Sequence, residues 1–281
     1  MALPIIKIEN ARGEVLNLST DPRYEPMLQS VGPPKATINR SKVALADGTR
    51  FNSSTVGERN PLLTIYLRQD VARARQNLYR YITTGAYIKL YYQADGLDVC
   101  IDGHVETAEV DPWTQTENMQ VSIICPQPYW KDVTESTVNA SVSTNLLEFP
   151  FAISSEGAEL SLLDNYTSTI IKNSGHVAAG ATFELVAKIR SLQPRIYNLS
   201  TGEYMGFYAD MLAGDRLVID TRAGSKAVTL IRDGVRTNYF NTLMEGSEFL
   251  QLPVGSSEFY YTVDEGMMDL YIHHTNMYQG V

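Results

Sequence analysis

The chain has 281 residues and a mass of 31.3 kDa, and its 44% hydrophobic and 20% charged residues are typical of a folded protein. This length fits about two domains of ordinary size. The formal net charge of -9 and the pI near 5.0 argue against a protein that grips nucleic acid, which would need a basic face. We therefore expect no specific nucleic-acid binding.

The sequence shows no evident targeting segment. No apolar run approaches the ~18 residues that a membrane helix requires, so membrane insertion is not expected. The N-terminus is followed by Lys7, Glu9 and Arg12, and it lacks the apolar stretch of a signal peptide. These features predict synthesis and folding in a cytoplasm.

The N-terminal stretch has short strand-like pieces, such as those around Ile5 and Val15, but prolines interrupt it. Because Pro26 and Pro33 cannot donate to a β-ladder, we expect a long arm or loop there. Residues 43–51 predict a hairpin, since an Asp-Gly pair at 47–48 supplies the positive φ of a tight turn. An apolar strand is predicted at 62–67.

Only residues 71–82 show the period of a helix. The preceding Asp70 is a candidate N-cap, and Gly85 lies just past the expected end. The apolar residues recur at intervals of three and four and so share one face: Val71, Ala74, Leu78, Tyr81 and Ile82.

The opposite face of this helix is basic. It carries Arg73, Arg75 and Arg80 among amide side chains. One interpretation is an ordinary solvated face. The other is that these arginines pair with acidic residues of another subunit, which makes them candidate subunit-interface residues.

Strands resume after the helix, at 87–92 and 99–101, with a turn at Asp95-Gly96 between them. Asp102-Gly103 admits two interpretations, a second tight turn or a bulge within one long strand. Another strand is predicted at 119–125.

A structural boundary follows. The two prolines within 125–130 end the last strand abruptly. Residues 131–147 are rich in Ser, Thr, Asn and Val and contain few large apolar residues. This change of composition predicts a linker, and it divides the chain into a domain at 1–133 and a domain at 134–281.

The second half alternates short apolar segments with turns such as Thr201-Gly202, Ala223-Gly224 and Asp233-Gly234. Strands at a spacing of about 8–12 residues are typical of a β-sandwich. The fold class is therefore mainly β, with an α+β N-terminal domain that carries one helix. The predicted strands of the second half are 182–189, 195–198, 204–208, 217–221, 227–232, 249–252, 259–263 and 268–273.

The residues that catalysis or metal binding requires form no recognisable pattern. His273 and His274 are adjacent in a predicted strand, so they point to opposite faces and cannot easily share one ion. A Cys125–His104 nucleophile pair is less favoured than a core thiol. The many carboxylates include no pair that stands out as a glycosidase site. We predict no catalytic residue, no metal site and no cofactor, and hence no enzyme.

Cys100 and Cys125 are the only cysteines, each within a predicted strand. They can form a disulfide if those strands pair. A reducing cytoplasm favours two buried thiols instead.

Two function classes remain open from composition alone. One is an assembly protein that forms rings or hubs, and the other is a binding module such as a carbohydrate-binding β-sandwich. The 17 tyrosines suit both a protein interface and a half-wet sheet. A closed oligomer would indicate the first class and a stable monomer the second.

Several phrases of the sequence, in this order, resemble the phage distal tail protein (Dit) family of long-tailed phages and tail-like particles. The resemblance covers the chain from end to end, although each phrase alone is weak. Departures occur at His176, where an Asp is frequent, and at Ser256-Ser257, where an Asn is usual; both are expected in turns. The matching phrases are Pro61–Leu67, Val121–Trp130, Ile171–Gly175, Gly214–Thr221, Asp233-Gly234, Gly246–Gly255 and Tyr278–Val281.

The resemblance implies a structural role at the distal end of a virion tail. It implies that the N-terminal domains form a homohexameric ring, or belt, and that the C-terminal domains are galectin-like β-sandwiches. Such a ring joins the tail tube protein to the tail-tip or hub protein, supports receptor-binding proteins and lets DNA pass. Assembly would take place in the bacterial host cytoplasm. The alternative function is a carbohydrate-binding module for adhesion to the host surface.

The predicted domain boundary can be tested by limited proteolysis. Because the residues that follow the proline-rich stop are polar to about 145, we expect the first cuts to fall within 131–150 and to leave two stable fragments. Mass spectrometry of the early fragments measures the cut sites. First cuts deep inside either half would contradict this boundary.

Overall fold

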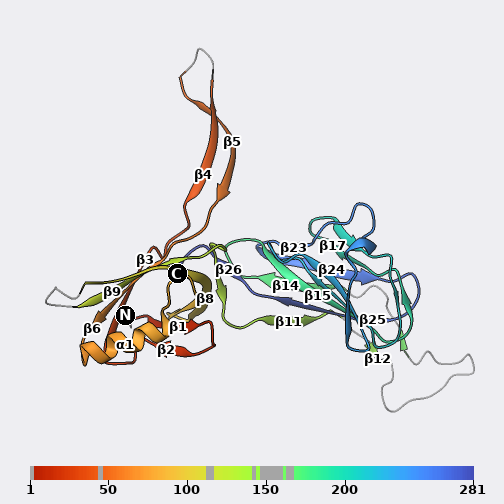
Figure 1. The fold of residues 1–281 in the computed structure, drawn as a ribbon. Coiled ribbons are helices and arrows are strands. Elements are labelled where there is room, and N and C mark those ends of the chain that lie inside the picture. Colours follow the sequence, from red (N-terminus) through yellow and green to blue (C-terminus); the bar gives the residue numbers. More distant parts are fainter. Residues whose placement is uncertain (1–2, 44–46, 112–116, 141–143, 146–160, 163–167) are drawn as a thin grey trace, which may run out of the picture. The chain divides into compact units, whose positions relative to one another are not determined.

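The computed structural model describes the chain except residues 1–2, 44–46, 112–116, 141–143, 146–160 and 163–167. Nearly all regular structure in the described residues is β-strand, as the sequence predicts, together with the single expected α-helix (Figure 1). The chain divides into two compact units, of which the first comprises 1–133 with 277–281 and the second comprises 134–276.

The first unit is built on one antiparallel sheet with the strand order β2-β1-β7-β8-β9-β6-β3. A short strand, β10, pairs with β8 on one side and with β26 on the other. The strands are β1 (Ile5–Asn10), β2 (Val15–Asn17), β3 (Tyr24–Gln29), β6 (Leu62–Leu67), β7 (Tyr87–Ala94), β8 (Leu97–Asp111), β9 (Asn118–Ile124), β10 (Trp130–Asp132) and β26 (Met277–Tyr278).

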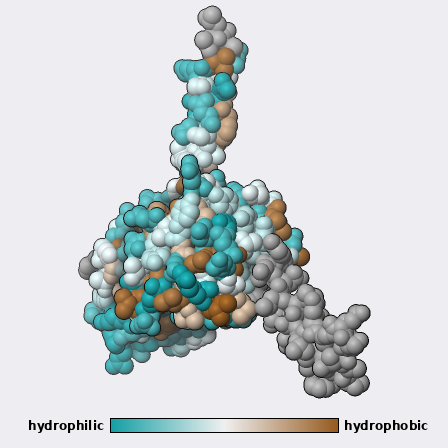
Figure 2. All heavy atoms as spheres, turned by 90° about the vertical axis from the view of Figure 1, so that its right-hand side faces the viewer, coloured by the Kyte–Doolittle hydropathy of each residue, from teal (hydrophilic) through white to brown (hydrophobic). Residues whose placement is uncertain are grey.

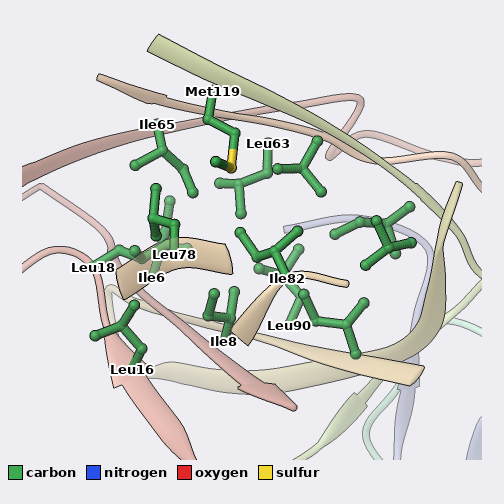
Figure 3. Packing of buried hydrophobic residues seen from close by; sticks show 14 of the residues in the cluster. Ile6, Ile8, Leu16, Leu18, Leu63, Ile65, Leu78, Ile82, Leu90 and Met119 are labelled. Atoms are coloured by element: carbon green, nitrogen blue, oxygen red, sulfur yellow. The ribbon is translucent and has the colours of Figure 1, made fainter. Parts of the chain in front are cut away.

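Helix α1 (Val71–Tyr81) closes the core of this sheet. Ala74 and Leu78 are fully buried, and Figure 3 shows Leu78 and Ile82 among side chains of β1, β6 and β7. The Tyr24 hydroxyl of β3 donates to the Ala74 carbonyl at 3.1 Å and accepts from the Asn77 amide at 3.0 Å, which ties the edge strand to the helix. The predicted apolar face is confirmed.

Asp70 lies at the predicted N-cap position, but the prediction that its side chain caps the helix is wrong. Asp70 adopts a left-handed conformation with φ of 45°, and its side chain makes no capping hydrogen bond. Its backbone carbonyl instead accepts the Ala74 N–H at 2.8 Å. Because Arg68 and Gln69 alone separate β6 from this residue, the chain must reverse sharply, and the positive φ of Asp70 makes that turn.

The Asp102-Gly103 ambiguity is resolved in favour of one long strand, β8, with a bulge between Val105 and Thr107. Gly103 is needed for close packing rather than for a turn. A Cβ atom there would lie 2.6 Å from the Ile123 Cγ2 atom and 2.8 Å from the Cys125 Sγ atom. Substitution of Gly103 by a larger residue would therefore push β8 away from Ile123 and Cys125.

The predicted hairpin is present but longer than 43–51. Strands β4 (Ala36–Lys42) and β5 (Thr49–Val56) pair with each other, and every residue of both is exposed. Gly48 has φ of 101°, as a tight turn requires, whereas residues 44–46 of the predicted hairpin lie outside the described part. We call the two strands β4 and β5 together the hairpin.

The second unit is a β-sandwich of two antiparallel sheets. The larger sheet has the order β11-β25-β15-β20-β21-β22 with β23 beside β15, and the smaller has the order β14-β24-β17-β18. Alternate residues point inward, and the Phe183 and Phe259 rings, 5.8 Å apart, join the two sheets. The larger sheet comprises β11 (Ser136–Asn139), β15 (Ala179–Ala187), β20 (Arg216–Asp220), β21 (Ala227–Arg232), β22 (Val235–Asn238), β23 (Gln251–Leu252) and β25 (Met268–His274).

The smaller sheet contains the strand β24, which begins earlier than predicted, so Ser256 and Ser257 lie in a strand and not in a turn. The segment predicted as a strand at 249–252 keeps only β23. The remaining elements are β14 (Thr169–Asn173), β17 (Arg195–Asn198), β18 (Glu203–Gly206), β24 (Gly255–Thr262), β12 (Thr144–Asn145), β13 (Ser161–Leu162), β16 (Ser191–Leu192), β19 (Asp210–Met211) and the 3₁₀ helix η1 (Phe240–Thr242).

The predicted C-terminal domain of 134–281 needs one correction. Residues 277–281 belong to the first unit, because β26 pairs Tyr278 with Trp130 and Met277 with Lys131. The Val281 N–H also donates to the Val31 carbonyl at 3.1 Å. Sequence proximity placed these residues with the second half, whereas backbone hydrogen bonds place them with the first.

The burial of Leu78 predicts its contribution to stability. Leu78→Ala should lower the free energy of unfolding by ~2–5 kcal/mol, since it leaves a cavity under the sheet. Arg73→Ala on the exposed face is the control and should change it by less than ~0.5 kcal/mol. Chemical denaturation followed by circular dichroism measures both. Equal effects of the two substitutions would mean that the helix presents another face to the core.

Candidate assembly surfaces

The three arginines of the predicted basic helix face differ in their exposure and in their contacts. Arg75 forms an ion pair with Glu117 of its own chain, and both side chains are largely buried, at 27% and 14% exposed. Arg73 and Arg80 are exposed, and no hydrogen bond or ion pair of the Arg73 side chain is found among the described residues. Of the three predicted interface residues, Arg73 and Arg80 remain open to a partner.

Arg80 marks the point where the β1–β2 turn meets the end of the helix. Its carbonyl accepts a hydrogen bond from the Arg12 Nη2 atom at 3.0 Å and a weak one from the Asn10 amide at 3.4 Å. A cation at the helix C-terminus complements the helix dipole. The hydrogen bond from Asn10 and the neighbouring Arg12 lower the pKa of Glu14 in the same cluster.

Arg59 is a structural residue that the sequence pattern did not reveal. It is 4% exposed, its Nη2 atom donates to the Gln279 carbonyl, and its Nη1 atom makes a long contact of 3.4 Å with the Val31 carbonyl. Its guanidinium lies 6.0 Å from the Trp130 ring centroid, and burial lowers its pKa. Because the partners of Arg59 are backbone carbonyls of distant segments, no local sequence motif predicts that it holds the C-terminal tail in place.

The hairpin exposes both of its faces to solvent. Cross-strand partners share a face, so the pairs Ala36–Val56 and Ile38–Ser54 put Ile38 and Val56 on the same side. Ile38 is 59% exposed and Phe51 61% exposed. Figure 2 shows hydrophobic side chains among the hydrophilic ones along the hairpin. A two-stranded ribbon is only marginally stable by itself, so these side chains are suited to a partner.

A second candidate surface lies in the first unit between β1 and β3. An open, mainly apolar hollow of about 460 Å³ is lined there by Ile5, Met27, Leu28 and Tyr92 among others. Strand β3 pairs with β6, and no strand in the described part of the chain pairs with its other edge. We call this hollow with its free strand edge the β3 seam. An unpaired edge beside apolar surface is a template for strand addition.

The structure does not assemble the nucleophile pair that the sequence left open. Cys125 is fully buried in the core of the first unit, whereas His104 is exposed. Burial raises the pKa of Cys100 to about 11 and that of Cys125 to about 12, so the thiolate that a nucleophile needs is disfavoured. Both cysteines are free.

No group of three or more His, Cys, Asp or Glu side chains in the described residues is placed to hold a metal ion. None of the helices described is long and apolar enough to cross a membrane.

A β-rich chain with an exposed hairpin and a free strand edge has the features of a structural protein that acts by assembly. Comparison with known proteins agrees with this class. Residues 174–278 match the family model of the siphovirus-type tail component, C-terminal domain. No curated protein sequence gives a significant match.

Solved structures share the fold over the whole chain. The crystal structure of SPP1 Dit (gp 19.1), described as a paradigm of the hub adsorption apparatus in phages that infect Gram-positive bacteria, has a TM-score of 0.70 at 11% identity, covering 97% of this chain and 98% of that chain. The phage P2 baseplate in its activated conformation with Ca contains a chain with a TM-score of 0.56 at 11% identity, covering all of both chains. The same baseplate with Sr gives 0.55 at 10% identity. The family match and the shared fold together confirm the predicted resemblance to phage distal tail proteins.

The buried thiols give a direct prediction. At pH 8, below the raised pKa values of Cys100 and Cys125, a disulfide reagent such as DTNB should react with neither thiol in the native protein and with both after unfolding. Thr55→Cys, on the exposed hairpin, is the control and should add one rapidly reacting thiol. Rapid reaction of the native wild-type protein, or no reaction after unfolding, would contradict two buried free thiols.

Proposed function

We propose that this chain is a structural subunit at the distal end of a phage tail or tail-like particle. Six copies form a closed ring that joins the tail tube to the tail tip or baseplate and lets DNA pass. The observation that carries the proposal is the exposed hairpin, in a first unit that also has a free strand edge. The fold shared with SPP1 Dit over 97% of the chain supports the location in the tail.

The two surfaces of the first unit are different in kind. The hairpin offers side chains and unpaired backbone groups, whereas the β3 seam offers an apolar hollow and one strand edge. An interface between two different surfaces of identical chains is heterologous, and repetition of it by a fixed rotation closes a ring. We therefore place the hairpin of one copy against the β3 seam of the next.

The energetics favour this contact. Ile38, Phe51 and Val56 are each more than 40% exposed in the single chain. Full burial of such side chains contributes roughly 1.5–3 kcal/mol each. Backbone hydrogen bonds along β3 would fix the register, as in strand addition. The exposed Arg73 and Arg80 extend this interface toward acidic residues of the neighbouring copy.

The charge of the chain agrees with a passive channel. With a net charge of -9, the subunit supplies no excess of basic residues to hold the DNA backbone. The partners in this proposal are the tail tube protein on one side and the tail-tip hub protein on the other, with receptor-binding proteins attached. Assembly takes place in the host cytoplasm before the particle is complete.

Native mass spectrometry and negative-stain imaging of the purified protein test the ring. We expect six-fold rings for the wild-type protein. The pair Ile38→Asp with Val56→Asp should convert them to monomers, because charge on the apolar face opposes burial. Thr37→Asp with Thr55→Asp, on the opposite and already polar face, is the matched control and should leave the rings intact.

Circular dichroism of each variant checks that the units remain folded. A wild-type protein that stays strictly monomeric at tens of micromolar would contradict the proposal. If the rings survive the Ile38 and Val56 substitutions, ring formation itself would stand, but the proposed role of the hairpin in it would be refuted.

A further inference from the structure

The second unit has a groove on the outward face of its larger sheet. A hollow of about 400 Å³ runs over β15, β20 and β21, and an adjoining hollow of about 320 Å³ continues over β21 and β22. The two share Thr229 and Arg236 as lining residues. We call the two adjoining hollows together the outer groove.

The floor of the outer groove mixes hydroxyl and apolar groups. The strand register puts Glu184, Val218 and Thr229 side by side in one row, and Arg216 and Ile231 side by side in the next. Val218, Thr229 and Ile231 are all partly exposed, although alternate residues of the same strands are buried. Such a floor offers hydrogen bonds together with small apolar patches.

One wall of the outer groove is an ordered polar network. Arg216 donates to Glu184, the His273 Nε2 atom lies 3.5 Å from the same carboxylate, and the His273 Nδ1 atom lies 2.9 Å from the Thr137 hydroxyl. The hydrogen bond from Arg216 lowers the pKa of Glu184, which keeps the carboxylate charged. Side chains held in this way present donors and acceptors in fixed positions.

The far end of the groove combines an exposed aromatic ring with two cations. Phe240 is 44% exposed and stacks on Phe249, with ring centroids 5.7 Å apart. The Lys226 ammonium lies 5.1 Å from the centroid of Phe249. Arg236 is exposed, and no carboxylate of the described residues pairs with it or with Lys226. By contrast, Arg216 and Arg222 are each paired, with Glu184 and Asp220.

We propose that the outer groove binds a saccharide chain that carries acidic groups. A sugar hydroxyl can both donate and accept a hydrogen bond. It therefore suits Arg216 as a donor, Glu184 as an acceptor and the threonine hydroxyls of the floor as either. The apolar face of a sugar ring fits the exposed ring of Phe240. The uncompensated charges of Arg236 and Lys226 select a carboxylate or phosphate substituent.

An acidic peptide would satisfy the two cations but would use neither the aromatic ring nor the fixed polar wall in a specific manner. The saccharide accounts for all three features together. The groove lies wholly within the second unit, so the inference stands independently of ring formation by the first unit.

Isothermal titration of the full-length protein tests the inference with four probes. Oligogalacturonate carries carboxylates, mannose 6-phosphate carries a phosphate, a maltooligosaccharide of matched length is neutral, and oligoglutamate is acidic without sugar rings. We expect at least one of the two acidic sugars to bind more tightly than both the neutral sugar and oligoglutamate, and the better one identifies the anion. Raised salt should weaken that binding.

Two substitutions locate the site. Arg236→Gln should weaken binding of the acidic sugar about tenfold or more, which is the usual scale for a charged hydrogen bond. Phe240→Ala should weaken it without affecting oligoglutamate. Lys172→Gln, an exposed cation on the smaller sheet, is the matched control and should leave binding unchanged.

Thermal unfolding checks that each variant is folded. Absence of binding by both acidic sugars would overturn the inference. Binding of oligoglutamate as tight as that of the sugars, unaffected by Phe240→Ala, would also overturn it, because it would show attraction of any polyanion. Native mass spectrometry of the same samples reports ring formation separately, so failure of one proposal is distinguishable from failure of the other.

Discussion

Each antiparallel strand of this protein presents side chains alternately to two faces, and in most strands only one of these faces is buried. Strand β15 shows the constraint clearly, since Phe183 and Leu185 fill the core and Thr182 and Glu184 point outward. The buried faces give each unit its own core. The outward faces are therefore free to carry polar networks, and the Arg216–Glu184–His273 wall of the outer groove is one of them.

The hairpin departs from this rule, because neither of its faces is buried within the chain. A segment that keeps Ile38 and Phe51 in solvent is costly for a subunit that works alone. The same exposure is useful for a subunit whose copies supply the missing contacts. The β3 seam, at the edge of the large sheet of the first unit, is the surface that we place against the hairpin in the proposed ring. These two uncovered surfaces of the first unit are the ones on which the proposed ring contact depends.

The C-terminal tail shows how a few polar contacts fix the path of the chain. Arg59 binds the Gln279 carbonyl from a buried position, and β26 adds to β10. Gly280 lies so close to Val31 that a Cβ atom would be 2.8 Å from the Val31 carbonyl oxygen. Strand β10, just before Thr134, and strand β26, just after Asn276, therefore both belong to the first unit.

The sequence by itself determined the mainly β class, the apolar face of α1 and the turns at Asp95-Gly96 and Asp233-Gly234, because periodicity and turn chemistry are local properties. It also carried the resemblance to distal tail proteins. Only the tertiary structure decided that Gly103 serves close packing, that Arg75 is occupied by Glu117, and that Arg59 holds the tail. The outer groove likewise exists only because strand pairing brings Arg216 and Arg236 onto one sheet, with Phe240 of η1 beside it. These contacts join residues far apart in the chain, and no local pattern encodes which distant segments will meet.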